Sequence, residues 1–167
     1  NAWWIPLMQS LTSDQQTNEA LPCLLIPMKG GRIVLPNVTM AELIPYQAPQ
    51  ATSAEASWLV GAIEWRGTMI PVISYEDFCG QRSAPQGQDL RVAVVNAPNG
   101  ESGSLRFFGI VTQGIPSLIK LEAAAIKENQ NSNLLKGQKM AVTLETGHAV
   151  IPDLDMIERE ILAQKWQ

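Results

Sequence analysis

The chain has 167 residues and a net charge of −4, from 12 Lys and Arg against 16 Asp and Glu, and 46% of its residues are hydrophobic. This composition is typical of one globular domain or of two small ones. No basic run interleaved with aromatic residues occurs, which argues against a nucleic-acid partner. The apolar stretch Trp3–Met8 is far shorter than the roughly 20 residues of a spanning helix, so direct membrane insertion is not expected, and a cytoplasmic protein is the simplest interpretation.

Residues 1–20 are predicted to form an N-terminal extension, with residues 1–2 interpreted as a remnant of cloning. Residues 9–20 are rich in Ser, Thr, Gln and Asn, which is typical of a loop. Trp3 and Trp4 fit two roles equally well, as core anchors or as partner contacts. Ordered structure is expected from Leu21 onwards.

The first predicted elements are strands. Two apolar runs, Pro22–Met28 and Arg32–Leu35, flank the glycine turn Lys29-Gly30-Gly31 and predict a hairpin. Residues 38–44 are expected to continue the sheet. Residues 46–57, rich in Gln, Ala, Pro and Ser, predict a connector.

The segment Trp58–Gly80 predicts a second hairpin followed by a short helix. Leu59, Ile63 and Trp65 alternate onto one face, whereas Glu64 and Arg66 fall on the other. The sequence Arg66-Gly67-Thr68 supplies the turn. After the returning strand, Ser74 begins a helix expected near residues 75–79, because Ser-x-x-Asp is a helix-start pattern. Residues 81–89 follow as a connector.

The second half repeats this order. Strands are predicted over residues 90–97, 106–112 and 115–121, with a helical turn at 122–127. A hairpin over residues 141–152 then leads into a helix near residues 155–165, with Asp155 expected as its cap and Glu158 as its third residue. In both halves of the chain the order is a hairpin, an Ile-Pro pair and a helix. Residues 21–80 and 90–162 are therefore each expected to build one half of the domain, and residues 163–167 a tail.

The search for catalytic chemistry finds no candidate set. The single histidine, His148, lies beside a turn without a nucleophile motif or a second imidazole, which favours a solvated position over a general base. Cys23 and Cys79 lack metal-ligand spacing and are predicted to be buried free thiols. We therefore expect no enzyme activity, no metal and no cofactor.

Several motifs resemble those of the CheW-like chemotaxis coupling proteins, over about residues 21–162. The strongest is Gly61-Ala62-Ile63-Glu64-Trp65-Arg66-Gly67-Thr68-Met69-Ile70-Pro71, which is similar in spacing to the family's Gly-Val-x-x-Leu-Arg-Gly-x-x-x-Pro signature. The run Met40-Ala41-Glu42-Leu43 stands where the family has Val-x-Glu-Ile. Trp65 replaces the usual Leu, and Ser74-Tyr75 replaces Asp-Leu, a departure that motivates the idea of a type IV pilus-associated, twitching-motility member.

This resemblance implies an all-β fold with short helices, in which two five-stranded β-barrel subdomains share a core, followed by a C-terminal helix. It also implies a receptor tip docked in an apolar groove between the barrels and a kinase regulatory domain bound at exposed barrel ends. The candidate partner contacts that carry over are Met40, Glu42 and Arg66. Glu64 is added to them because it shares a strand face with Arg66.

Three functions remain open. The resemblance favours a non-catalytic scaffold that couples chemoreceptors to a histidine kinase. The alternatives are an adaptor that binds or sequesters a kinase without receptor arrays, and a small-ligand-binding β-barrel module. The third is supported by the Trp and Met content but by no set of polar residues that would orient a ligand.

Overall fold

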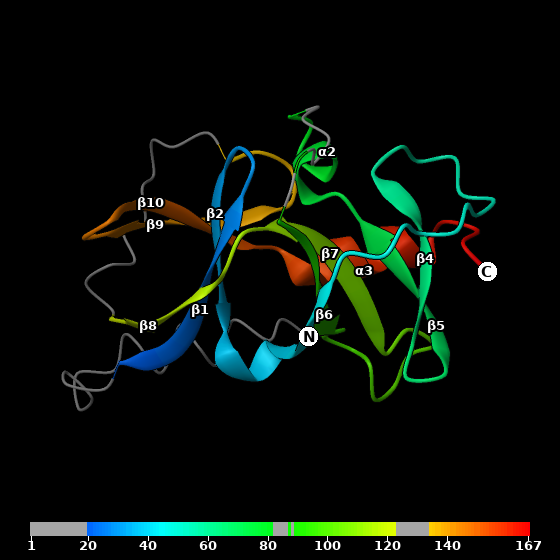
Figure 1. Cartoon of the computed structure of the whole chain (residues 1–167), viewed down its shortest axis with the longest axis horizontal. Helices are drawn as coiled ribbons and strands as arrows, with labels where there is room; N and C mark the ends of the chain where they lie inside the picture. The colour runs from blue at the N-terminus through cyan, green and yellow to red at the C-terminus, as the bar shows by residue number, and fades with distance from the viewer. Residues whose placement is uncertain (1–19, 82–86, 88, 123–133) are drawn as a thin grey trace.

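The computed structural model describes residues 20–81, 87, 89–122 and 134–167. Most of the predicted extension and most of the helical turn expected at 122–127 therefore lie outside the described residues. Within them the chain forms ten strands, two α-helices and one 3-10 turn (Figure 1). Their bounds are β1 (Leu21–Met28), β2 (Gly31–Pro36), η2 (Asn37–Thr39), β3 (Met40–Pro45), β4 (Leu59–Trp65), β5 (Thr68–Ile73), α2 (Tyr75–Phe78), β6 (Leu90–Asn96), β7 (Phe107–Gln113), β8 (Ser117–Leu121), β9 (Gln138–Leu144), β10 (Gly147–Pro152) and α3 (Leu154–Leu162).

The strands form two five-stranded sheets with the same internal plan. Sheet 1 has the order β8-β1-β2-β10-β9, and sheet 2 has the order β3-β6-β7-β5-β4. Each sheet contains two hairpins, β1–β2 and β9–β10 in sheet 1 and β6–β7 and β4–β5 in sheet 2. The second strand of one hairpin pairs in parallel with the second strand of the other, β2 with β10 and β7 with β5. Both second hairpins close with two-residue loops, at 66–67 and 145–146, and each precedes a helix. The predicted repeat is therefore present.

The prediction that residues 21–80 and 90–162 each build one half is wrong in its pairing. Sheet 1 joins β1 and β2 of the first half to β8, β9 and β10 of the second, and sheet 2 joins β6 and β7 to β3, β4 and β5. The two repeats thus exchange strands reciprocally: β3, β4 and β5 join the second half's hairpin, and β8, β9 and β10 join the first half's hairpin. Local patterns predict a strand and a tight hairpin, but the partner of an exchanged strand is set by contacts distant in sequence.

Neither sheet is closed into a barrel by backbone pairing, which refines the expected β-barrel subdomains. Among the described strands, β8 and β9 remain edges of sheet 1, and β3 and β4 remain edges of sheet 2. Part of the β4 edge is covered by the predicted connector, since Gln50 N donates to Ala62 O at 2.8 Å and Ala62 N donates to Gln50 O at 2.9 Å. A Cβ on Gly61 would lie 2.4 Å from Gln50 O, so this close approach requires glycine.

The two sheets share a core, as expected. The largest apolar cluster combines residues of both sheets with both helices, including Ile26, Phe108, Phe78, Ile157 and Ile161, all at most 2% exposed. Each sheet also encloses a cluster of its own on its other face. In the view of Figure 1, α3 follows β10 and overlaps the strands of sheet 2, and its apolar face packs into the shared cluster.

Both helices begin at side-chain caps. The predicted cap Ser74 accepts a hydrogen bond from Asp77 N at 3.4 Å. At α3 the cap is Asp153 rather than the expected Asp155, because the helix starts directly after β10, and Asp153 Oδ1 accepts from Met156 N at 3.1 Å. Glu158 has a different role, since it turns inward to the loop after β6 and accepts hydrogen bonds from Asn99.

Candidate interaction site

The tip of the β4–β5 hairpin positions the main group of predicted contact residues. Trp65 pairs with Thr68, which leaves Arg66 and Gly67 as a two-residue loop with φ of 48° and 77°. Positive φ at both positions defines the type I′ geometry that matches the twist of a hairpin. Arg66 adopts it although it is not glycine.

Glu42 connects the two edges of sheet 2. It lies on β3, whereas Trp65 lies at the end of β4, on the opposite edge. Glu42 Oε1 accepts hydrogen bonds from Trp65 Nε1 at 3.0 Å and from a terminal guanidinium nitrogen of Arg66 at 3.2 Å. Side chains therefore close the curled sheet where the backbone does not.

Arg66 is held by two neighbours. Its guanidinium carbon lies 4.4 Å from the centre of the Trp65 ring, over which it stacks, while its nitrogen pairs with Glu42. Trp65 is 7% exposed and packs edge-to-face on Phe107, with ring centres 4.8 Å apart. The result is a preoriented cation on an aromatic base, a combination that is common in the energetically dominant residues of protein interfaces.

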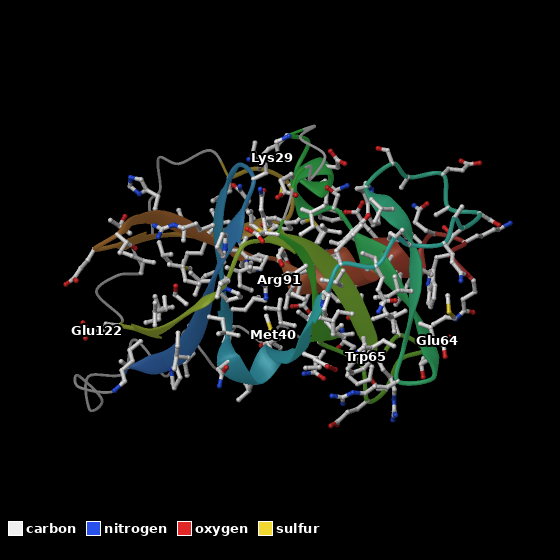
Figure 2. The ribbon with its side chains drawn as sticks, in the orientation of Figure 1. Lys29, Met40, Glu64, Trp65, Arg91 and Glu122 are labelled. Atoms are coloured by element: carbon white, nitrogen blue, oxygen red, sulfur yellow. The ribbon has the colours of Figure 1, made fainter. Side chains whose placement is uncertain are left out.

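The four predicted contact residues do not form a single cluster in the structure. Glu42 and Arg66 form one cluster, which Glu64 does not join: it is exposed on β4 opposite Met69. The expected grouping of Arg66 with Glu64 is thus replaced by the Glu42–Arg66 pair, because Arg66 belongs to the turn rather than to the strand. Met40 is half-buried against the shared core, and Figure 2 shows it near the junction of the two sheets, away from Trp65.

Met40 belongs to a second, apolar surface. Leu24 on β1 also packs against the shared core, and Leu118 on β8 lies directly opposite it and is 70% exposed. Val38 in η2, which lies against β1, is 86% exposed. We call Leu24, Val38, Met40 and Leu118 the junction face. Sequence reasoning missed Leu118, because alternation within a strand predicts a face but not whether that face is covered. It missed Val38 because that residue was expected in a strand but lies in η2.

The residues considered as candidates for catalysis or metal binding lie apart from these two surfaces in character. Cys23 and Cys79 are buried and free, as predicted, and burial raises the pKa of each thiol to about 11, which keeps both neutral. His148 is exposed on β10. No group of three or more His, Cys, Asp or Glu side chains able to hold a metal occurs among the described residues. Within that same part of the chain, no helix is long and apolar enough to span a membrane.

Comparisons with known proteins agree with this architecture. The model of the CheW-like domain family matches residues 22–161, so the chain belongs to that family. Among solved structures, the chain is similar to the scaffolding protein TtCheW from Thermoanaerobacter tengcongensis, with a TM-score of 0.68 at 13% identity over 80% of this chain and 88% of that one. Among curated protein sequences, none matches. The fold is that of the chemotaxis scaffold and adaptor class.

Proposed function

We propose that this chain is a non-catalytic, cytoplasmic scaffold that couples chemoreceptors to a histidine kinase in a bacterial chemosensory pathway. The observation that carries the proposal is the Glu42–Trp65–Arg66 cluster, which presents an oriented guanidinium at the end of sheet 2. The resemblance to the family carries Glu42 and Arg66 over as partner contacts, and Trp65, where the family has Leu, joins them in this chain. A rigid, partly exposed cation costs little to order on binding, so it is suited to recognition.

Two surfaces support two partners. The junction face is apolar and lies at the meeting point of the sheets, so it suits the apolar surface of a receptor's helical tip. The Glu42–Arg66 cluster is charged and lies at a sheet end, so it suits the kinase regulatory domain. We assign the receptor to the junction face and the kinase to the cluster.

The departures at Trp65 and at Ser74-Tyr75 favour a pathway that controls type IV pili rather than flagella. The family signature has Leu where Trp65 stands, and a Leu side chain has no donor for Glu42. Co-purification from native cells followed by mass spectrometry identifies the pathway, because the recovered kinase and receptor belong to one system or to the other.

Binding measurements test the two-surface assignment. Leu118→Glu should weaken binding of a receptor-tip fragment at least tenfold and spare the kinase regulatory domain, and Arg66→Glu should do the reverse. Leu162→Glu is the matched control, because Leu162 is 46% exposed on α3, outside both surfaces. Kinase binding without any receptor binding would support instead an adaptor that sequesters the kinase. If neither partner binds the unmodified chain, the scaffold proposal fails.

A further inference from the structure

A pocket of about 310 Å³ lies beside the Glu42–Arg66 cluster. Its walls come from the β4–β5 hairpin, from the residues that lead into β7, and from the last residues of the chain. Trp65, Met69, Phe107 and Trp166 supply its apolar lining. Met69 is 40% exposed, whereas Trp166 packs partly into the shared core and Phe107 is half-buried. The pocket is therefore a supported apolar hollow open at the surface.

Two guanidinium groups line the same pocket, those of Arg66 and Arg106. Arg66 is paired with Glu42, but Arg106 is exposed and forms no ion pair with any residue that the structure describes. Because the Glu42 carboxylate already balances Arg66, the positive charge that this pocket offers is that of Arg106, on a chain whose net charge is −4.

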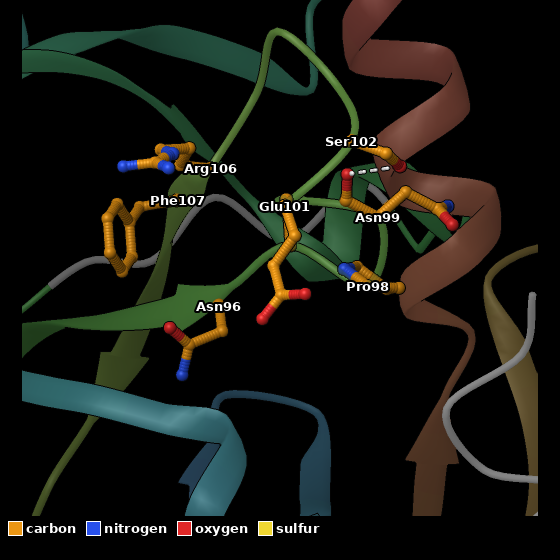
Figure 3. A pocket seen from close by; sticks show the side chains of 9 residues that line it. Asn96, Pro98, Asn99, Glu101, Ser102, Arg106 and Phe107 are labelled. Carbon is orange, nitrogen blue, oxygen red and sulfur yellow. Dashed lines mark hydrogen bonds between the residues drawn. The ribbon is translucent and has the colours of Figure 1, made fainter.

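The nearest acidic residue in the loop before β7 does not neutralise Arg106. Glu101 and Arg106 line an adjoining pocket of about 470 Å³, shown in Figure 3. There the Glu101 carboxylate points towards Asn96, whereas the Arg106 guanidinium points away from Glu101. The positive charge is therefore available to a partner.

We propose that this pocket, which we call the Arg106 pocket, binds a segment of the kinase regulatory domain in which an acidic residue stands beside an aliphatic one. The carboxylate pairs with Arg106 and Arg66, and the aliphatic side chain packs between Met69 and Trp166. Carboxylates are the anions that guanidinium groups bind in two-pronged geometry, and apolar walls favour an aliphatic neighbour. This inference rests on the proposed coupling function and specifies the chemistry of its kinase contact.

Titration calorimetry with the CheW-like regulatory domain of the histidine kinase from the same organism tests the inference. Arg106→Glu should lower the affinity at least tenfold, and Arg106→Lys, which keeps the charge, should lower it less. Lys120→Glu is the matched control: Lys120 is exposed on β8 of sheet 1, and its reversal makes the same change in net charge. Its affinity should stay within twofold of the unmodified chain. Because Arg106 and Lys120 are exposed, both variants should fold, which thermal melting verifies.

The outcomes separate the inference from the function on which it rests. If Arg66→Glu weakens binding while Arg106→Glu binds like the unmodified chain, the Arg106 pocket is not a contact and coupling stands. An equal loss in Arg106→Glu and Lys120→Glu would indicate a general charge effect and would also overturn the inference. If the unmodified chain does not bind the regulatory domain, the proposed function and this inference both fall.

Discussion

Glu158 of α3 accepts two hydrogen bonds from one residue, Asn99, at 3.1 Å from the backbone nitrogen and 2.7 Å from Nδ2. Glu158 is 2% exposed, so its carboxylate depends on these donors. The pair fixes the loop between β6 and β7, which includes Arg106, to the helix that packs in the shared core. A helix residue thus supports the loop at the proposed kinase contact.

Replacing Glu158 should therefore destabilise the whole domain. Glu158→Ala leaves the Asn99 donors without this acceptor and is expected to cost about 2–4 kcal/mol of unfolding free energy. Urea denaturation measures the change. Glu160→Ala on the same helix is the comparison, because Glu160 is half-buried and pairs with Lys136 near the surface, and its loss should cost at most about 1 kcal/mol. Equal losses in the two variants would contradict the anchoring role.

The turn at Arg66 allows binding to be separated from stability. Arg66→Asn places at φ 48° a residue that tolerates this conformation better, while it removes the ion pair and the stacking on Trp65. The two effects oppose each other, so unfolding free energy should change by less than about 0.5 kcal/mol. Affinity for the kinase regulatory domain should nevertheless fall at least tenfold. Unchanged affinity in the folded variant would show that Arg66 serves only the turn.

Arg66→Glu is expected to lower the unfolding free energy more than Arg66→Asn does. A tip residue without neighbours would change stability by at most about 0.5 kcal/mol, but here the new carboxylate would face Glu42. We expect a cost of about 1 kcal/mol, measured by thermal or urea unfolding. In a Glu42→Gln background, which keeps an acceptor for Trp65 Nε1, Arg66→Glu should cost less. An equal cost in both backgrounds would mean that the pair is not coupled.

Glu76 makes stability depend on pH. It is 2% exposed, and burial raises the pKa of its carboxyl above the ordinary value of 4.5. The folded state therefore holds the proton more tightly than the unfolded state, so this contribution is fully present below pH 4.5 and is lost as the pH rises through the folded-state pKa. Glu76→Gln removes the titration, so its gain in Tm over the unmodified chain should be larger at pH 7 than at pH 4. A difference that shrinks over this range would contradict the assignment.

The reciprocal exchange of strands predicts that neither half folds alone. A fragment ending at Gly80 lacks three strands of sheet 1, and one beginning at Leu90 lacks three strands of sheet 2. Each fragment should give a circular dichroism spectrum of unfolded chain, while an equimolar mixture should recover the β signal and a cooperative melt. A single fragment with its own cooperative transition would refute the interdependence of the halves.

The sequence predicts the elements well where the signals are local. Alternation locates β4, an apolar run locates β5, Gly67 marks their turn, and Ser74 marks the start of α2, all as observed. The pairing of β3 with β6 and of β8 with β1 is not predictable in this way, because no local pattern specifies a strand partner. For the same reason the contact of Glu42 with Trp65 could not be derived from spacing, although the family motifs single out Glu42 and Arg66.

The exchange also sets an order of assembly during synthesis. All five strands of sheet 2 have left the ribosome once Gln113 has, whereas sheet 1 waits for β10, which ends at Pro152. The β1–β2 hairpin has only its own pairing until β8 is made, and its β2 edge stays open until β10 pairs with it, so its apolar faces are exposed to chaperones and to other nascent chains. The first strands to be made are therefore among the last to be protected.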